Sequence, residues 1–209
     1  MKNLNHKAVK AELEKQPNIL ITTHRGPDGD AMGSSLGLAG ILKKKGCEVA
    51  VIAPTDYPAF LNWIKGNEEV LVWGKNNKLI KNVVKEADVL FCLDFNALHR
   101  IDEVGELISK SDGKKVMIDH HQQPDDFVDY MISDTSASST AEMVYEFITK
   151  LGDEGLIDSD IGEALYCGIM TDTGSFRFPS TTNKTHFTVG GIIEKGADHS
   201  MVHRRIYDS

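Results

Sequence analysis

Asp119, His120 and His121 form the most informative cluster of side chains in this sequence, because all three can bind a metal ion and they follow an apolar run at residues 116–118. Such a run is typical of a buried strand. In an open α/β sheet, ligands bind at the carboxyl ends of the strands, so this triplet is expected on the ligand-binding edge. Further side chains with metal-binding groups occupy similar positions at the ends of predicted elements: His24, Asp28, Asp30, Asp94 and Asp172.

Carboxylates that meet at one sheet edge repel one another and raise each other's pKa, so they need a positive partner. Arg25 is the only Lys or Arg within residues 24–30. The sequence therefore predicts divalent cations. Several carboxylates with one His per ion suit Mn²⁺, Mg²⁺ or Co²⁺ better than Zn²⁺. The candidate ligands are too many for one ion, whereas two ions sharing a carboxylate would use all of them and activate a water for attack on phosphorus.

Each of these residues also has an ordinary structural explanation. Asp28 and Gly29 could form a turn, with Asp30 as the N-cap of the following helix. Asp94 could cap the next helix, Asp172 could be a turn residue, and the two neighbouring histidines could be exposed in a loop. Chance would rarely place so many such clusters at the ends of elements. We therefore favour a common metal site over the separate explanations.

The elements that must position these residues alternate along the chain. Strands are predicted at residues 19–21, 48–53, 89–93, 116–118 and, at a sheet edge, 130–132. Helices are predicted at residues 5–16, 31–45, 79–87, 98–108, 144–151, 161–169 and 199–207. Strands separated by helices indicate the α/β class, with a mostly parallel sheet and helices on both faces. Gly33 and Gly37 favour close packing of their helix on the sheet over a phosphate loop, and no P-loop sequence occurs.

The composition of the chain limits the classes of function that it can have. The chain has 209 residues, of which 41% are hydrophobic, enough for one domain with a real core. A formal net charge of −8 argues against broad electrostatic binding of nucleic acid, although a phosphorylated ligand could still be held through metal ions. We expect no membrane association, because no apolar run is long enough to span a bilayer and no secretory leader is visible. Cys47, Cys92 and Cys167 suggest buried reduced thiols and a cytoplasmic location.

Four further residues could contact a phosphate group. Arg177 and Arg100 could each bind phosphate oxygens in a bidentate manner, although both could equally be surface residues. Ser138 and Ser139 lie in a hydroxyl-rich run and could offer hydroxyl and backbone N–H groups to a phosphate at a helix N-terminus. For the two serines, ordinary N-capping is slightly favoured.

Taken together, these residues resemble the motifs of the DHH phosphoesterase family, in the same order and over nearly the whole chain. The residues that match its four motifs are His24, Asp28 and Asp30; Asp94; Asp119, His120 and His121; and Asp172. Residues 24–34 and 173–178 are most similar to the branch of bacterial oligoribonucleases and phosphoadenosine phosphate phosphatases. The resemblance implies the fold of the DHH N-terminal domain and hydrolysis of phosphate esters in short oligoribonucleotides or phosphoadenosine phosphate (pAp).

The resemblance also implies a site for two metal ions, usually Mn²⁺. The implied ligand sets are His24, Asp28 and Asp94 for one ion, and Asp30, Asp94, His120 and Asp172 for the other. Asp94 would then bridge the two ions. His121 would face the substrate phosphate, and Asp119 would orient a ligand histidine. A water between the ions would attack phosphorus in line, without a covalent intermediate.

Relatives in this branch carry a smaller C-terminal domain that binds substrate, and no segment here matches its Gly-rich motif. We therefore expect residues 1–198 to form the catalytic domain and residues 199–209 to begin a connector to a C-terminal domain missing from this chain. The expected partner is a short single-stranded RNA or a small phosphorylated nucleotide, and a homodimer is also conceivable. Two alternatives stay open: the same chemistry on a cyclic dinucleotide, pyrophosphate or polyphosphate, and a non-catalytic regulatory domain that binds a nucleotide or metal.

Overall fold

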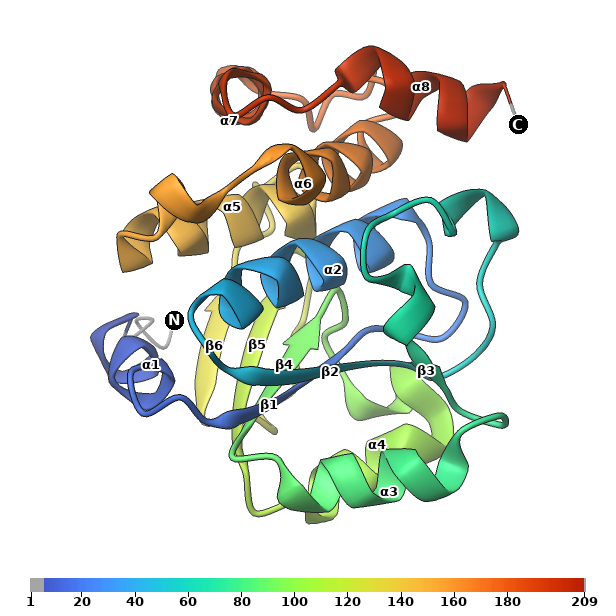
Figure 1. Cartoon of the computed structure of the whole chain (residues 1–209), viewed down its shortest axis with the longest axis vertical. Helices are drawn as coiled ribbons and strands as arrows, with labels where there is room; N and C mark the ends of the chain where they lie inside the picture. The colour runs from blue at the N-terminus through green and yellow to red at the C-terminus, as the bar shows by residue number, and fades with distance from the viewer. Residues whose placement is uncertain (1–5, 209) are drawn as a thin grey trace.

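Parallel strands form the central sheet of the described part of the chain, residues 6–208 of this computed structural model (Figure 1). The order across the six-stranded sheet is β3-β2-β1-β4-β5-β6. The strands are β1 (Asn18–Thr22), β2 (Glu48–Ala53), β3 (Leu71–Val72), β4 (Val89–Leu93), β5 (Lys114–Asp119) and β6 (Tyr130–Ser133). Every adjacent pair is parallel, and Leu20 of β1, for example, pairs with Ala50 of β2 and Leu90 of β4.

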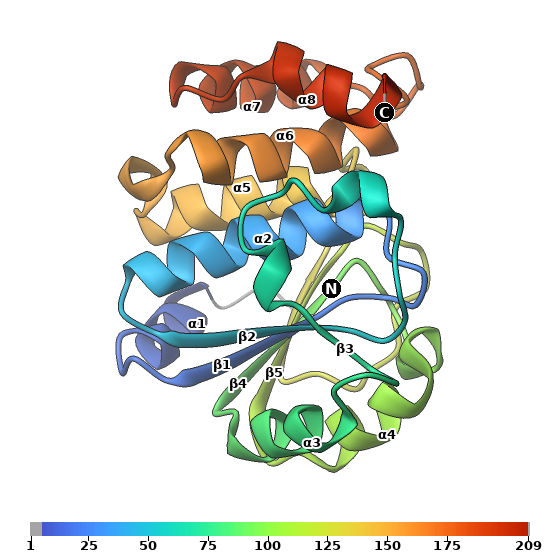
Figure 2. The ribbon, with the colours of Figure 1, turned by 45° about the vertical axis from the view of Figure 1, so that its right-hand side comes forward.

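Helices cover both faces of this sheet in layers. The α-helices are α1 (His6–Leu13), α2 (Gly29–Lys44), α3 (Asn77–Glu86), α4 (Asp102–Lys110), α5 (Thr140–Leu151), α6 (Ser159–Asp172), α7 (Asn183–Glu194) and α8 (His199–Tyr207). Short 3-10 helices, η1 to η4, lie at Ala59–Leu61, Asn67–Glu69, Leu98–Ile101 and Glu154–Leu156. α3 and α4 cover one face, α2 and α5 the other, α6 packs on α2 and α5, and α7 with α8 is outermost (Figures 1 and 2). The predicted α/β class with helices on both faces is confirmed.

The hydrophobic core follows this layering. All five residues of β4 are buried, as expected for a central parallel strand covered on both faces. One apolar cluster lies between the sheet and the α2, α5 and α6 layers, and a second lies under α3 and α4. The three cysteines are buried with free thiols. Among the described residues, no helix combines the length and apolar character needed to cross a bilayer.

The close packing of α2 against α6 sets the geometry of the candidate site. A Cβ atom at Gly33 would lie 2.3 Å from the carbonyl oxygen of Ala164 and 2.9 Å from the backbone nitrogen of Gly168, so only glycine allows this approach. The helix packs on the sheet as predicted, but Gly33 and Gly37 lie on its other side and face α6. The two helices run antiparallel, which brings the last residue of α6, Asp172, beside the first turn of α2.

Several predicted elements differ in detail from the observed ones. α1 ends at Leu13 rather than residue 16, and its predicted start at Asn5 lies outside the described residues. The single helix predicted over residues 98–108 is divided into η3 and α4. The division falls at Asp102, the first residue of α4, which has a φ of 47°. The two-residue β3 is not among the predicted elements.

Candidate metal centre

The carboxyl ends of β1, β4 and β5 supply most of the candidate site. Strand order diverges at β1, which pairs with β2 on one side and β4 on the other, and such a switch point is where open α/β sheets bind ligands. The first turn of α2 and the last turn of α6 reach the same place. The described residues contain three groups whose potential ligand atoms lie within 4.8 Å of one another: His24, Asp28 and Asp94; Asp30, His120 and Asp172; and Asp94, His120 and His121.

His24 presents a ring nitrogen to two carboxylates. Its Nδ1 lies 2.8 Å from the backbone carbonyl oxygen of Arg25. Because a carbonyl can only accept, Nδ1 carries the proton of the neutral ring, and Nε2 is left with a lone pair. This Nε2 is 3.4 Å from Asp94 Oδ2 and 3.9 Å from Asp28 Oδ2. Burial alone lowers the pKa of His24, but the hydrogen bond and charge of Asp94 outweigh it and raise the pKa. The arrangement favours a cation, or otherwise a proton, between ring and carboxylates.

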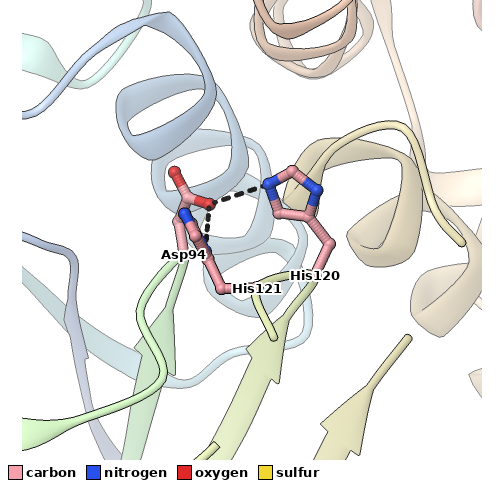
Figure 3. Close-up of side chains that lie close together, drawn as sticks. All are labelled: Asp94, His120 and His121. Atoms are coloured by element: carbon pink, nitrogen blue, oxygen red, sulfur yellow. Dashed lines mark ion pairs between the residues drawn. The ribbon is translucent and has the colours of Figure 1, made fainter. Parts of the chain in front are cut away.

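His120 lies on the opposite side of Asp94 and is near three carboxylates, of which Asp94 is shared with His24. Its Nε2 is 3.4 Å from Asp172 Oδ2, 3.6 Å from Asp94 Oδ1 and 4.0 Å from Asp30 Oδ2. Figure 3 shows His120 and His121, from the loop after β5, both beside the carboxylate of Asp94, with a dashed line from one Asp94 oxygen to each ring. Asp94 therefore directs one oxygen toward His24 and the other toward His120. Separations of 3 to 4 Å between ligand atoms are compatible with a shared ion at about 2.1 Å from each.

Within the described part of the chain, no Lys or Arg forms an ion pair with the acidic residues of this cluster, and only histidines face them. Asp30 is 1% exposed, and burial followed by the charges of Asp94 and Asp172 holds the pKa of its carboxyl well above the usual range. Burial also raises the pKa of Asp172 to about 6, with the neighbouring carboxylates adding to the shift and His120 opposing it. The pKa of Asp94 is lowered, because the hydrogen bonds and charges of its neighbours outweigh its burial. This donor set of carboxylates and imidazoles fits divalent cations.

Asp119 holds His121 rather than His120. Asp119 is fully buried, and its carboxylate accepts hydrogen bonds from the backbone nitrogen of His121 at 3.0 Å and from Nδ1 of the same residue at 2.7 Å. The partner of Asp119 is thus His121, the histidine expected to face the substrate, and the expected orientation of a ligand histidine by Asp119 stays a prediction. The hydrogen bond to Asp119 raises the pKa of His121.

The predicted substrate contacts differ in their surroundings. Arg100 is half-buried, and its charge acts on His121, whose pKa it lowers. Arg177 is exposed, with its Nε donating to the carbonyl oxygen of Gly174 at 2.6 Å. Ser138 is buried and donates its backbone N–H and hydroxyl to Glu142, while Ser139 is the N-cap of α5. Ser139 thus makes the N-capping contact that the structural alternative predicts, whereas Ser138 contacts Glu142 instead.

The first turn of α5, which was considered as a phosphate-binding site, instead donates hydrogen bonds to two acidic residues of the candidate metal centre. The backbone N–H groups of Thr140 and Ala141 donate to the two oxygens of Asp30, at 2.7 and 2.8 Å. The hydroxyl of Thr140 donates to Asp94 Oδ1 at 2.9 Å. Sequence reasoning missed Thr140 as a site residue. The run Ser-Ser-Thr signalled a helix start, but only the fold shows that this start meets α2 and the end of β4.

The ordinary explanations for two acidic residues are also corrected. The N-cap of α2 is Asp28, which accepts from the backbone nitrogens of Asp30 and Ala31, so Asp30 is free of that role. Asp94 caps no helix, because η3 begins four residues later with Ala97 at its N-cap position. Asp94 instead has a φ of 64°, a left-handed conformation that Asp tolerates better than most residues and that often marks functional sites.

Known proteins are similar to this chain in sequence and in fold. The model of the DHH family, N-terminal domain, matches residues 18–169. The bifunctional oligoribonuclease and PAP phosphatase NrnA of Bacillus subtilis is 31% identical over 192 residues, which cover 91% of this chain and 57% of that protein. An exopolyphosphatase-related protein from Bacteroides fragilis has a crystal structure that matches with a TM-score of 0.95 and 37% identity, over 100% of this chain and 62% of that one.

A more distant match extends the fold comparison. Exonuclease RecJ, solved with manganese bound, matches with a TM-score of 0.56 and 13% identity over 91% of this chain and 48% of that one. At this identity the match shows a shared fold. In each of the three comparisons, this chain spans less than two thirds of the length of the other protein.

Proposed function

This chain belongs to the DHH family, and we propose that it is the catalytic part of a phosphohydrolase that cleaves short oligoribonucleotides or pAp with two divalent metal ions. The observation that carries the proposal is the position of Asp94 between two groups of potential ligands. One oxygen faces His24 at 3.4 Å, and the other faces His120 at 3.6 Å. The similarity to the bifunctional oligoribonuclease and PAP phosphatase NrnA of Bacillus subtilis supports the choice of substrates.

The residues divide into two ligand sets that share one carboxylate. The proposed ligands are His24, Asp28 and Asp94 on one side, and Asp30, Asp94, His120 and Asp172 on the other. Mn²⁺ is the first ion to test, because mixed carboxylate and imidazole donors suit it, and Mg²⁺ or Co²⁺ would also fit. When bound, such ions lower the pKa of a water and neutralise charge on a phosphoryl group.

His121 and Asp119 serve the substrate in this proposal. Because Asp119 binds Nδ1 of His121, the proton on this nitrogen is fixed, and Nε2 is left to meet a ligand. The raised pKa of His121 increases the fraction of imidazolium, which can donate a hydrogen bond to a phosphate oxygen. Arg100, close enough to act on His121, adds positive charge on the same side. These groups would orient the phosphate against the ligand sets.

The decisive experiment measures phosphate release from pAp and mononucleotide release from a short oligoribonucleotide, each with Mn²⁺ and with chelator. We expect activity with Mn²⁺ only, and a loss of about 100-fold or more in Asp94→Asn, because both ligand sets lose their shared carboxylate. Asp112→Asn is the matched control, since this exposed residue precedes β5 at the opposite sheet edge. Full activity in Asp94→Asn would reject the shared-ligand role. Binding of Mn²⁺ and nucleotide without turnover would favour a regulatory domain.

A further inference from the structure

Thr140 contacts two carboxylates that belong to different parts of the candidate metal centre. The residue is fully buried at the first position of α5. Its backbone N–H donates to Asp30 Oδ2 at 2.7 Å, and its hydroxyl donates to Asp94 Oδ1 at 2.9 Å. Asp30 lies in α2 and Asp94 follows β4, so a single residue ties together carboxylates 64 positions apart in the sequence.

The hydroxyl of Thr140 determines how Asp94 is turned. The backbone of Asp94 is held by its hydrogen bond to the carbonyl oxygen of Ile118, at 3.1 Å. Rotation of a carboxylate about its last torsion is soft, and the side chain alone does not fix it. With Thr140 bound to Oδ1, this oxygen stays on the side of His120, and Oδ2 is left facing His24 at 3.4 Å. Asp94 thus offers one oxygen to each ligand group.

A neutral hydroxyl is well suited to this task. A carboxylate oxygen can accept more than one hydrogen bond or ligand, so Oδ1 keeps acceptor capacity after it binds Thr140. A Lys or Arg at the same place would orient Asp94 equally well, but its charge would compete with a cation for the carboxylates. The hydroxyl orients Asp94 without neutralising it, and the cluster keeps the negative charge that binds a cation.

We propose that Thr140 is a positioning residue that sets the orientation of Asp94, and with it the two ligand groups, before any ion binds. This inference rests on the proposed function, because it takes the two groups to be metal sites. The hydroxyl acts through Asp94 and does not contact the substrate. Loss of a group that orients a metal ligand typically lowers metal affinity by about 10- to 100-fold. The same range is expected here.

The test is a titration of the folded chain with Mn²⁺. Binding is measured in two ways: as the change in melting temperature, and as the free Mn²⁺ detected by electron paramagnetic resonance. Thr140→Val keeps the shape of the side chain and removes its hydroxyl, so we expect half-saturation to need about tenfold more Mn²⁺ or more. Thr140→Ser keeps the hydroxyl, and its affinity should stay within about threefold of the unmodified chain. Thr149→Val is the control, because that hydroxyl lies on the same helix but donates to the carbonyl oxygen of Tyr145.

The outcomes separate this inference from the proposed function. If the unmodified chain binds no Mn²⁺, the proposed metal site fails and the inference fails with it. If the unmodified chain binds Mn²⁺ and Thr140→Val binds it equally well, only the positioning role is overturned. A purely structural role would lower the melting temperature without Mn²⁺ and leave the half-saturating concentration unchanged. Should Thr140→Val not fold, the comparison of Thr140→Ala with Thr140→Ser isolates the same hydroxyl and is judged by the same tenfold criterion.

Discussion

Replacing Asp172 with Asn should stabilise the metal-free protein at alkaline pH. The pKa of Asp172 is raised from its usual value of 3.8 to about 6, chiefly by burial. The native state therefore holds a proton on this group that the unfolded chain has already released, and stability falls as pH rises between these values. A difference of about two pH units at roughly 1.4 kcal/mol each gives about 3 kcal/mol as an upper limit. Since the side chain is 32% exposed, solvent screening reduces this value, and we expect about 1 to 2 kcal/mol.

Urea denaturation in chelator, followed by circular dichroism, measures this effect. At pH 8 the free energy of unfolding of Asp172→Asn should exceed that of the unmodified chain, and the difference should shrink toward zero as the pH approaches about 4. Asp112→Asn, at an exposed position, should change neither value. A less stable Asp172→Asn at pH 8, or a difference that does not vary with pH, would show that Asp172 carries no electrostatic strain. Added Mn²⁺ should reverse the order, because it stabilises only a protein that binds it.

Two further predictions concern packing and the second histidine. Gly33→Ala should lower the free energy of unfolding by about 1 to 3 kcal/mol, because its Cβ would overlap backbone atoms of α6. Gly190→Ala is the control and should be neutral or stabilising, because open space surrounds that position. Equal effects of the two substitutions in thermal melts would refute the close contact. The raised pKa of His121 means that its imidazolium contributes stability that is complete below about pH 6.5 and lost as pH rises through the raised value. Asp119→Asn should shift the NMR titration of His121 to lower pH, and an unchanged titration would contradict the assignment.

The sequence predicts the fold class and the convergence of the acidic clusters because both follow from one rule. Apolar runs separated by helices imply parallel strands, and parallel strands end at a shared edge. His24, Asp94 and His120 follow three such strands, so their proximity could be predicted from position alone. The resemblance to the DHH family supplies the pairing of residues into ligand sets, which spacing cannot supply.

The parts that could not be predicted depend on contacts between distant segments. Gly33 looks the same in sequence whether it faces a strand or a helix, and only the packing of α6 on α2 shows which. Asp119 precedes two histidines, and the choice of His121 as its partner depends on the turn after β5. In the sequence, Thr140 looks like any residue at the start of a helix. Only the fold, which places that helix start against Asp30 and Asp94, shows its contacts with them.

The same packing explains why the fold tolerates a cluster that opposes its own stability. A Cβ at Gly168 would lie 2.8 Å from Asp30 Oδ1, so glycine there admits the buried carboxylate beside α6. The positive end of α5 lies against Asp30 through two backbone N–H groups and partly offsets the cost of burying its charge. The rest of that cost persists, as the raised pKa of Asp30 indicates. A cation bound beside Asp30 would offset part of this cost, and that part would contribute to its binding free energy. If the cluster binds a cation as proposed, removing the carboxylate of Asp30 should therefore both stabilise the metal-free protein and weaken the binding of the cation.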